Sequence, residues 1–182
     1  LNGTILDDCT NQITGATATF SVTHNSITTT CTPTNDIGTG NYSCILNTTL
    51  LEPGTYNTTF NATLTNYNTN TTERTNTFFV ETVPFLTGPA VNPTTGGWGE
   101  TFTFTVNATD LDNDTMRVQL WIRQLPSGSF TLEGNNASVT GNNITVRCTK
   151  TYTSSDIATY TFKFNVTEDD AGQVNQTAEQ NF

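Results

Sequence analysis

Apolar and polar residues alternate with a period of two along most of the chain, and helical periodicity is nowhere convincing. Side chains of a β-strand point alternately to opposite faces, so this pattern predicts strands with one buried face. In the first half we expect strands at 16–22, 27–31, 42–46, 56–64 and 75–80. In the second half we expect them at 102–108, 116–122, 130–132, 144–148 and 160–166, with a polar strand within 174–182. The sequence therefore predicts an all-β fold.

Prolines and glycines gather near the middle of the chain. Residues 83–99 hold Pro84, Pro89 and Pro93 together with Gly96 and Gly97, and such residues interrupt regular structure. We interpret this stretch as a linker region between domains 1–84 and 85–182, each long enough to bury its own core. The expected architecture is two tandem β-sandwiches.

Two short motifs carry a resemblance to a known family. Residues 156–162 (Asp-Ile-Ala-Thr-Tyr-Thr-Phe) resemble the D-x-A-x-Y-x-C segment of immunoglobulin-like domains, with Phe162 in the place of the cysteine. Residues 51–56 (Leu-Glu-Pro-Gly-Thr-Tyr) resemble the corner that precedes a strand in fibronectin-like and in bacterial or archaeal immunoglobulin-like modules. The resemblance implies two immunoglobulin-like β-sandwich domains, with Tyr160 bonded through its hydroxyl to nearby backbone.

The composition extends this resemblance. The chain is rich in Thr and Asn, and the strand expected at 102–108 ends in the acidic run Asn107 to Asp114. In this it is similar to modules of archaeal surface-layer and extracellular filament proteins. That similarity implies a structural component of a cell surface.

The most frequent short motif is the N-glycosylation sequon, Asn-x-Thr/Ser. Six of these asparagines, at 47, 57, 61, 107, 143 and 165, fall on the expected solvent faces of strands, and the Thr at +2 shares that face. We therefore expect N-linked glycans on several sites. The candidates are Asn2, Asn41, Asn47, Asn57, Asn61, Asn70, Asn107, Asn113, Asn136, Asn143, Asn165 and Asn175.

The four cysteines are Cys9, Cys31, Cys44 and Cys148. No Cys-x-x-Cys pair exists and His24 is the single histidine, which argues against a zinc site and for disulfides in an oxidising compartment. We favour Cys31–Cys44, which closes a short loop; the other two are then free, joined to each other or bonded to another chain. The expected location is extracellular, at the cell surface, with a signal peptide removed.

The formal net charge of −10 disfavours nucleic acid and anionic lipid as partners, and no apolar run is long enough to span a membrane. Alternate carboxylates at Asp110, Asp112 and Asp114 follow a strand end and form a candidate calcium site, the one cofactor considered. Residues 168–170 (Glu-Asp-Asp) end another strand and could share it. The alternative interpretation is a solvated acidic turn.

We expect no enzymatic activity, because His24 has no nucleophile motif nearby and no phosphate loop or metalloprotease motif is present. The favoured function is a structural subunit, a filament or a lattice component that binds copies of itself through sheet edges or through the terminal segments 1–7 and 174–182. One alternative is an adhesin or receptor-type module that recognises a glycan or protein through loops 32–40 and 127–135. Another is a carbohydrate-binding appendage with an aromatic platform of Trp98, Trp121 and Tyr152.

Overall fold

A computed structural model describes residues 1–169 and 172–182. The chain divides into two compact units, unit 1 (Leu1–Glu81) and unit 2 (Thr82–Phe182), close to the predicted boundary. Both are built from antiparallel strands, so the all-β prediction is confirmed. In the described part of the chain, no helix has the length and apolarity needed to cross a membrane.

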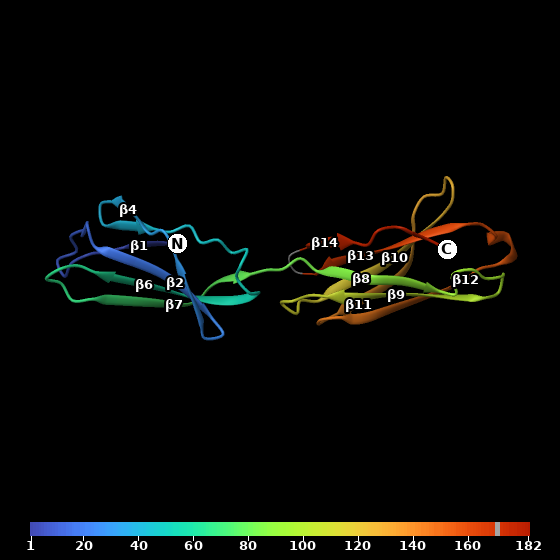
Figure 1. Ribbon diagram of the computed structural model, residues 1–182, viewed down its shortest axis with the longest axis horizontal. Coiled ribbons are helices and arrows are strands. Elements are labelled where there is room, and N and C mark those ends of the chain that lie inside the picture. Colours follow the sequence, from blue (N-terminus) through green and yellow to red (C-terminus); the bar gives the residue numbers. More distant parts are fainter. Residues whose placement is uncertain (170–171) are drawn as a thin grey trace. The chain divides into compact units, whose positions relative to one another are not determined.

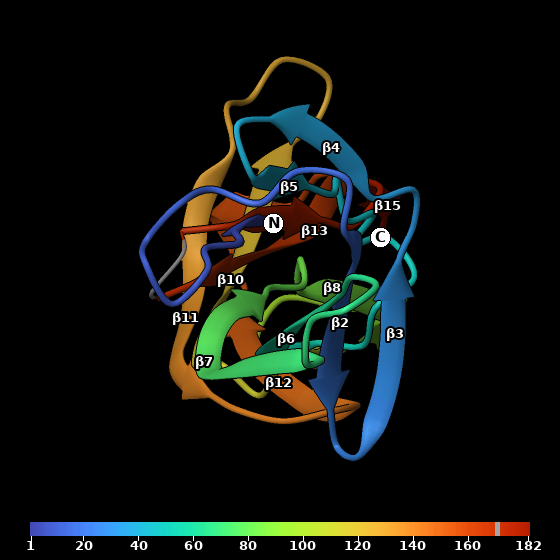
Figure 2. The same ribbon diagram turned by 90° about the vertical axis from the view of Figure 1, so that its left-hand side faces the viewer.

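Unit 1 contains seven described strands in two sheets. One sheet has the order β1-β5-β4 and the other β3-β2-β6-β7, and the turned view shows β4 and β5 in a different layer from β6 and β7 (Figure 2). The strands are β1 (Asn2–Thr4), β2 (Thr17–His24), β3 (Ile27–Cys31), β4 (Asn35–Gly38), β5 (Asn41–Ser43), β6 (Gly54–Thr63) and β7 (Asn70–Val80).

The core of unit 1 is small. Phe20, Cys31, Tyr42 and Cys44 form its buried cluster, and the ring of Phe60 stacks on that of Phe20 with centroids 4.6 Å apart. The alternation of β2 explains the cluster, because Phe20 and Val22 share its inner face and are almost fully buried.

Unit 2 also has two sheets, of order β12-β9-β8 and β11-β10-β13-β14, with β15 pairing on β13. Figure 1 labels the first seven of its strands, β8 to β14. The strands are β8 (Phe85–Asn92), β9 (Thr101–Thr109), β10 (Met116–Gln124), β11 (Thr131–Val139), β12 (Ile144–Thr151), β13 (Tyr160–Glu168), β14 (Val174–Gln176) and β15 (Gln180–Asn181). A short 3₁₀ turn, Ser154–Asp156, precedes β13.

The core of unit 2 is larger and comes from both sheets. Alternate residues of β9, β10 and β13 are buried, as the period-two pattern predicts. They face one another in a single cluster, which makes this unit a β-sandwich. The buried set is Phe102, Phe104, Val106, Ala108, Met116, Val118, Leu120, Ile122, Val146, Cys148, Tyr152, Phe162, Phe164 and Val166.

The same hydrogen bond fixes the approach to the central strand of each unit. The hydroxyl of Tyr160 donates to the carbonyl of Asp156 at 2.7 Å, and that of Tyr56 donates to the carbonyl of Glu52 at 2.9 Å. The tyrosine corner implied for Tyr160 is therefore confirmed, and Tyr56 makes a second one.

The predicted linker 83–99 is wrong in its first half, which contains a strand. Phe85–Asn92 forms β8, which pairs with β9 at the edge of a sheet. Pro89 is accommodated because the register shifts between Thr87 and Ala90, where Gly88 takes φ of 59°. A proline, which lacks an N–H donor, fits at an edge strand or a bulge, so it does not end this strand.

Other departures concern polar segments. The predicted loop 32–40 contains β4, and the loop 127–135 runs into β11. Strand β7 begins at Asn70, five residues before the strand predicted at 75–80. Both terminal segments pair inside their own unit, since β1 pairs with β5, and β14 and β15 pair with β13.

All six basic residues lie within strands. Arg74 is in β7, and the other five occupy three strands of unit 2: Arg117, Arg123, Arg147, Lys150 and Lys163. Three of them form ion pairs with acidic neighbours of their own unit, the shortest being Arg123–Glu179 at 2.6 Å.

Candidate functional site

One side of unit 1 is left open beside β1. This strand pairs only with β5, so it is an edge of its sheet. Leu1 exchanges two backbone hydrogen bonds with Cys44, and Ile5 donates to the carbonyl of Gly40. In an antiparallel ladder the intervening residues, Asn2 and Thr4, turn their backbone groups to the other side. Those groups form a free strand edge.

A groove of about 800 Å³ runs between this edge and the inner face of β6 and β7. Thr58 and Phe60 of β6 and Arg74 of β7 line it. A neighbouring hollow of about 590 Å³ shares Phe60 and continues past Leu64. Residues 70–77 are exposed on both faces of β7, so nothing in the described chain covers this part of the sheet.

Gly3 lets β1 approach the groove closely. A Cβ atom at this position would lie 2.8 Å from the Phe60 ring, so a larger residue would force the ring to move. Phe60 is therefore held under β1 on one side, while its partly exposed ring faces the groove.

Unit 2 shows how the equivalent place is covered. Its sheet β11-β10-β13-β14 matches β3-β2-β6-β7 of unit 1, and β9-β12 matches β1-β5. In unit 2 the side of β9 away from β12 is occupied by β8, whose Leu86 and Val91 pack on the core. No described strand of unit 1 occupies the corresponding position beside β1.

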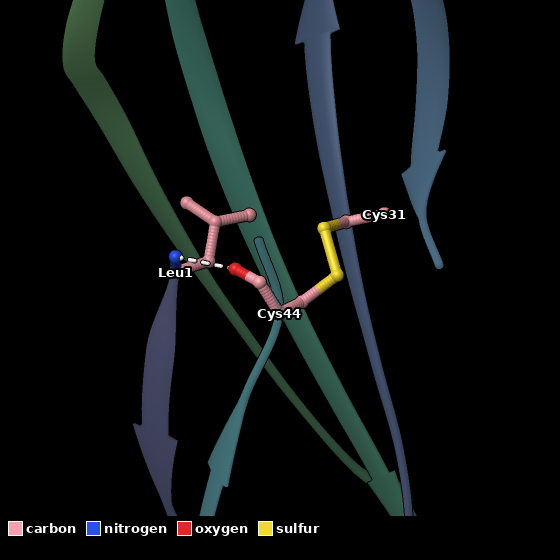
Figure 3. The surroundings of a disulfide bond; sticks show 3 residues. All are labelled: Leu1, Cys31 and Cys44. Atoms are coloured by element: carbon pink, nitrogen blue, oxygen red, sulfur yellow. Dashed lines mark hydrogen bonds between the residues drawn. A yellow bond between two sulfur atoms is a disulfide. The ribbon is translucent and has the colours of Figure 1, made fainter. Parts of the chain in front are cut away.

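The two sheets of unit 1 are joined by the disulfide Cys31–Cys44, the pairing that the short loop favours (Figure 3). Cys31 ends β3 in one sheet and Cys44 directly follows β5 in the other. The bond closes a loop with a sequence separation of 13, worth about 3 kcal/mol in the chain-entropy model. Figure 3 also shows the hydrogen bond from Leu1 to Cys44, so the same residue anchors β1.

The other two cysteines are free thiols in contrasting places. Cys9 is exposed in the loop after β1, where its backbone N–H donates to Asp7. Cys148 is buried in β12 and accepts a hydrogen bond from Nδ2 of Asn136 at 3.1 Å. Burial raises the pKa of the Cys148 thiol, and the Asn136 hydrogen bond only partly offsets this.

None of the twelve sequon asparagines is buried. Asn57, Asn61, Asn107 and Asn165 lie on the outer faces of strands, as predicted, whereas Asn47 and Asn143 lie outside the strands. A glycan would be attached to the side-chain nitrogen. At Asn136 that nitrogen donates to buried Cys148, so a glycan there would require this hydrogen bond to break.

Acidic side chains converge at one pole of unit 2. Asp110, Asp112 and Asp114 follow β9, and Glu168 ends β13. Oxygen atoms from Asp112, Asp114 and Glu168 lie within 4.8 Å of one another. Asp169 instead lies 3.7 Å from Arg117, and the predicted contribution of Asp170 falls outside the described residues.

The first two aspartates of this pole share one hydroxyl. Oγ1 of Thr82 lies 3.3 Å from Oδ1 of Asp110 and 3.1 Å from Oδ2 of Asp112. Burial, followed by the neighbouring Asp112 carboxylate, raises the pKa of Asp110 to about 6. Burial also raises the pKa of Asp112, but hydrogen bonds from Asp110 and Thr82 outweigh it and the net pKa is lowered. Nothing in the sequence pattern marked Thr82 as a neighbour of these carboxylates.

The remaining candidates do not form a site. His24 has both ring nitrogens within 2.8 Å of partners, Thr55 and Asn25, which gives it a structural role. The aromatic platform is wrong, because Tyr152 is buried against Phe102 while Trp98 is 71% exposed.

No protein-family model and no curated protein matches the chain. Among solved structures, it is similar to a PKD domain of an M14-like peptidase from Thermoplasmatales archaeon SCGC AB-540-F20. The identity is 19% over 55% of this chain and 88% of that chain, with a TM-score of 0.35. A DUF3823 family protein from Bacteroides ovatus aligns at 11% identity over 99% of this chain and 95% of its own, with a TM-score of 0.37. Both likenesses are loose, and no conclusion about function rests on them.

Proposed function

We propose that this chain is a structural subunit of an extracellular, N-glycosylated cell-surface assembly, a filament or a surface lattice, and is not an enzyme. Its two units are tandem immunoglobulin-like sandwiches in this interpretation, which the shared order of their larger sheets and their two tyrosine corners support. Copies of the chain associate through the free edge of β1.

The observation that carries the proposal is the uncovered groove of unit 1. Unit 2 fills the corresponding position with β8, so the fold has a place there for one more extended strand. A strand from a second copy would pair with the outward backbone groups of Asn2 and Thr4 and cover Phe60. Adding a strand in this way removes a free edge and buries an aromatic ring at once.

Charge favours a second copy as the occupant. Arg74 is the one basic residue of unit 1, and it lines the groove. The chain as a whole carries a net charge of −10, so an acidic segment of another copy is attracted to this place.

The surface chemistry supports the extracellular part of the proposal. The disulfide of unit 1 persists in an oxidising environment, and exposed sequons on outer strand faces suit a glycan coat. Glycans on those faces would also shield strands from unwanted association.

The test is the assembly state of the purified chain and of the variant Arg74→Glu, measured by sedimentation velocity and negative-stain electron microscopy. We expect the wild type to form filaments or sheets. The variant should need a roughly tenfold higher concentration to do so, because like charges across an interface repel. A wild type that stays monomeric at all concentrations would overturn the proposal.

The matched control is Thr75→Glu. Thr75 is the next residue of β7, is exposed and does not line the groove, so it adds a negative charge to the opposite face of the same strand. The control should assemble like the wild type. If both variants assemble equally well, the contact does not use this groove and the proposal of edge association at β1 fails.

A further inference from the structure

Three segments of unit 2 that are distant in sequence meet at its acidic pole. Thr82 precedes β8, the loop 110–115 joins β9 to β10, and Glu168 ends β13. The backbone N–H of Thr82 donates to Oδ2 of Asp112 at 2.7 Å, and that of Asp169 donates to the carbonyl of Thr115 at 2.9 Å. Strand pairing places Glu168 opposite Met116, directly after this loop. The pole is therefore fixed by backbone contacts.

The spacing of the carboxylates suits one hard cation. Asp112, Asp114 and Glu168 each offer an oxygen atom, and these atoms lie within 4.8 Å of one another. Calcium binds oxygen at about 2.4 Å, so two ligands of one calcium ion are at most about 4.8 Å apart. All three oxygens could therefore contact the same ion.

A second observation points to a ligand at this place. The side chain of Asp110 is fully buried, and its Oδ2 has no hydrogen-bond partner among the described residues. Its other oxygen shares the Thr82 hydroxyl with Asp112, so the two carboxyl groups face the same spot. Oδ1 of Asp112 is also buried without a hydrogen bond in the described structure.

Buried carboxylate oxygens without hydrogen bonds are stabilised by a nearby positive charge. Neither Asp110 nor Asp112 takes part in an ion pair within the described part of the chain. A buried carboxylate is strongly destabilising unless a cation or a set of hydrogen bonds compensates it. A divalent cation at this pole would compensate both the buried Asp110 carboxylate and the buried Oδ1 of the half-buried Asp112.

The donor set selects the ion. All candidate ligands are oxygens, without histidine or cysteine in the group, which favours hard cations over zinc or copper. Magnesium requires a near-octahedral shell and retains several waters, whereas calcium accepts many carboxylates in irregular geometry. We propose that unit 2 binds one calcium ion at this pole, through Asp112, Asp114 and Glu168 with Asp110 as the buried inner carboxylate. This inference does not depend on the proposed function.

The direct test is calorimetric titration of calcium chloride into the chain after removal of metals with a chelator. We expect one site per chain, with a dissociation constant no weaker than about 1 mM, the range of extracellular modules, and binding of magnesium at least about tenfold weaker. Calcium should also raise the melting temperature, because a ligand of the folded state stabilises it. No heat and no shift in melting temperature at about 10 mM calcium would overturn the proposal.

Two variants locate the site. Asp112→Asn should weaken calcium binding by about tenfold or more, since it removes one anionic ligand. Glu100→Gln is the control, because it removes one exposed carboxylate next to the opposite end of β9. An Asp112→Asn chain that is folded by circular dichroism and binds calcium as well as Glu100→Gln would refute the site. If Asp112→Asn does not fold, Glu168→Gln takes its place in the same comparison.

Discussion

At the scale of single residues, the two free cysteines show how position controls chemistry. Cys9 is exposed in a loop, whereas Cys148 is 8% exposed, lies under Asn136 and has a raised pKa through burial. The thiolate is the reactive form, so burial and a raised pKa both slow alkylation. A similar difference in surroundings distinguishes Asn136, whose side-chain nitrogen contacts buried Cys148, from the sequon asparagines whose side chains reach solvent.

We therefore expect selective labelling of the native chain. Iodoacetamide at neutral pH should modify Cys9 within minutes and leave Cys148 intact until denaturant is added, a difference of about a hundredfold or more in rate. Peptide mass spectrometry measures the extent of modification of Cys9 and Cys148. Cys31 and Cys44, which are joined in a disulfide, serve as an internal unlabelled reference. Equal labelling of Cys9 and Cys148 in the native chain would show that β12 opens readily.

At the scale of strands, the tyrosine corners hold the connection that leads into the central strand of each unit. In unit 2 the Tyr160 hydroxyl donates to the carbonyl of Asp156, and the ring packs on Tyr152 with centroids 4.8 Å apart. The bond fixes the loop before β13, which pairs with three other strands.

Removal of the Tyr160 hydroxyl should lower the free energy of unfolding by a predictable amount. Tyr160→Phe keeps the ring but leaves the Asp156 carbonyl without its donor, so we expect the free energy of unfolding to fall by about 1–2 kcal/mol. Urea denaturation measures this change in the free energy of unfolding. Tyr67→Phe is the control, because Tyr67 is 55% exposed in a loop and should change stability by less than about 0.5 kcal/mol. Equal values for the two variants would contradict the role of the corner.

How much of the fold the sequence predicts depends on which strands bury one face. β2, β9, β10 and β13 bury alternate residues, β6 buries Tyr56 and Ala62 of one face, and the pattern predicts all five close to their bounds. β4 is exposed at every position, and so are residues 70–77 of β7, so neither has an alternating pattern to detect. In β8 the prolines suggested a linker, but an edge position with a register shift tolerates Pro89.

The candidate sites follow the same logic. The aspartates at 110, 112 and 114 are close in sequence, so their grouping was predictable, and the end of β13 was suspected to share the pole. Thr82 joins them only because β8 starts beside that pole, a placement without local signal. The groove beside β1 has no motif at all, since it results from a strand that one unit contains and the other lacks.

At the scale of the whole molecule, the two units share the order of the larger sheet and one strand pair of the smaller sheet, but their cores differ. Unit 2 has a large core shared by two sheets, whereas unit 1 relies on a small cluster, a disulfide and Phe60 beside an open groove. Stability per unit should follow the amount of apolar surface buried, so unit 1 gains more from any partner that covers it.

The placement of the six basic residues inside strands has a consequence for digestion of the chain. Trypsin cuts after Lys and Arg and needs several residues of unpaired, mobile backbone, which paired strands do not offer. The native chain should survive trypsin at least about a hundredfold longer than the urea-unfolded chain, as followed by gel electrophoresis. A protease specific for Glu should act much sooner, because Glu52 lies outside the strands and is exposed. Rapid tryptic cleavage after Arg117 or Arg123 would contradict the strand pairing of β10. This arrangement keeps lysine and arginine, the residues after which trypsin cuts, out of the loops.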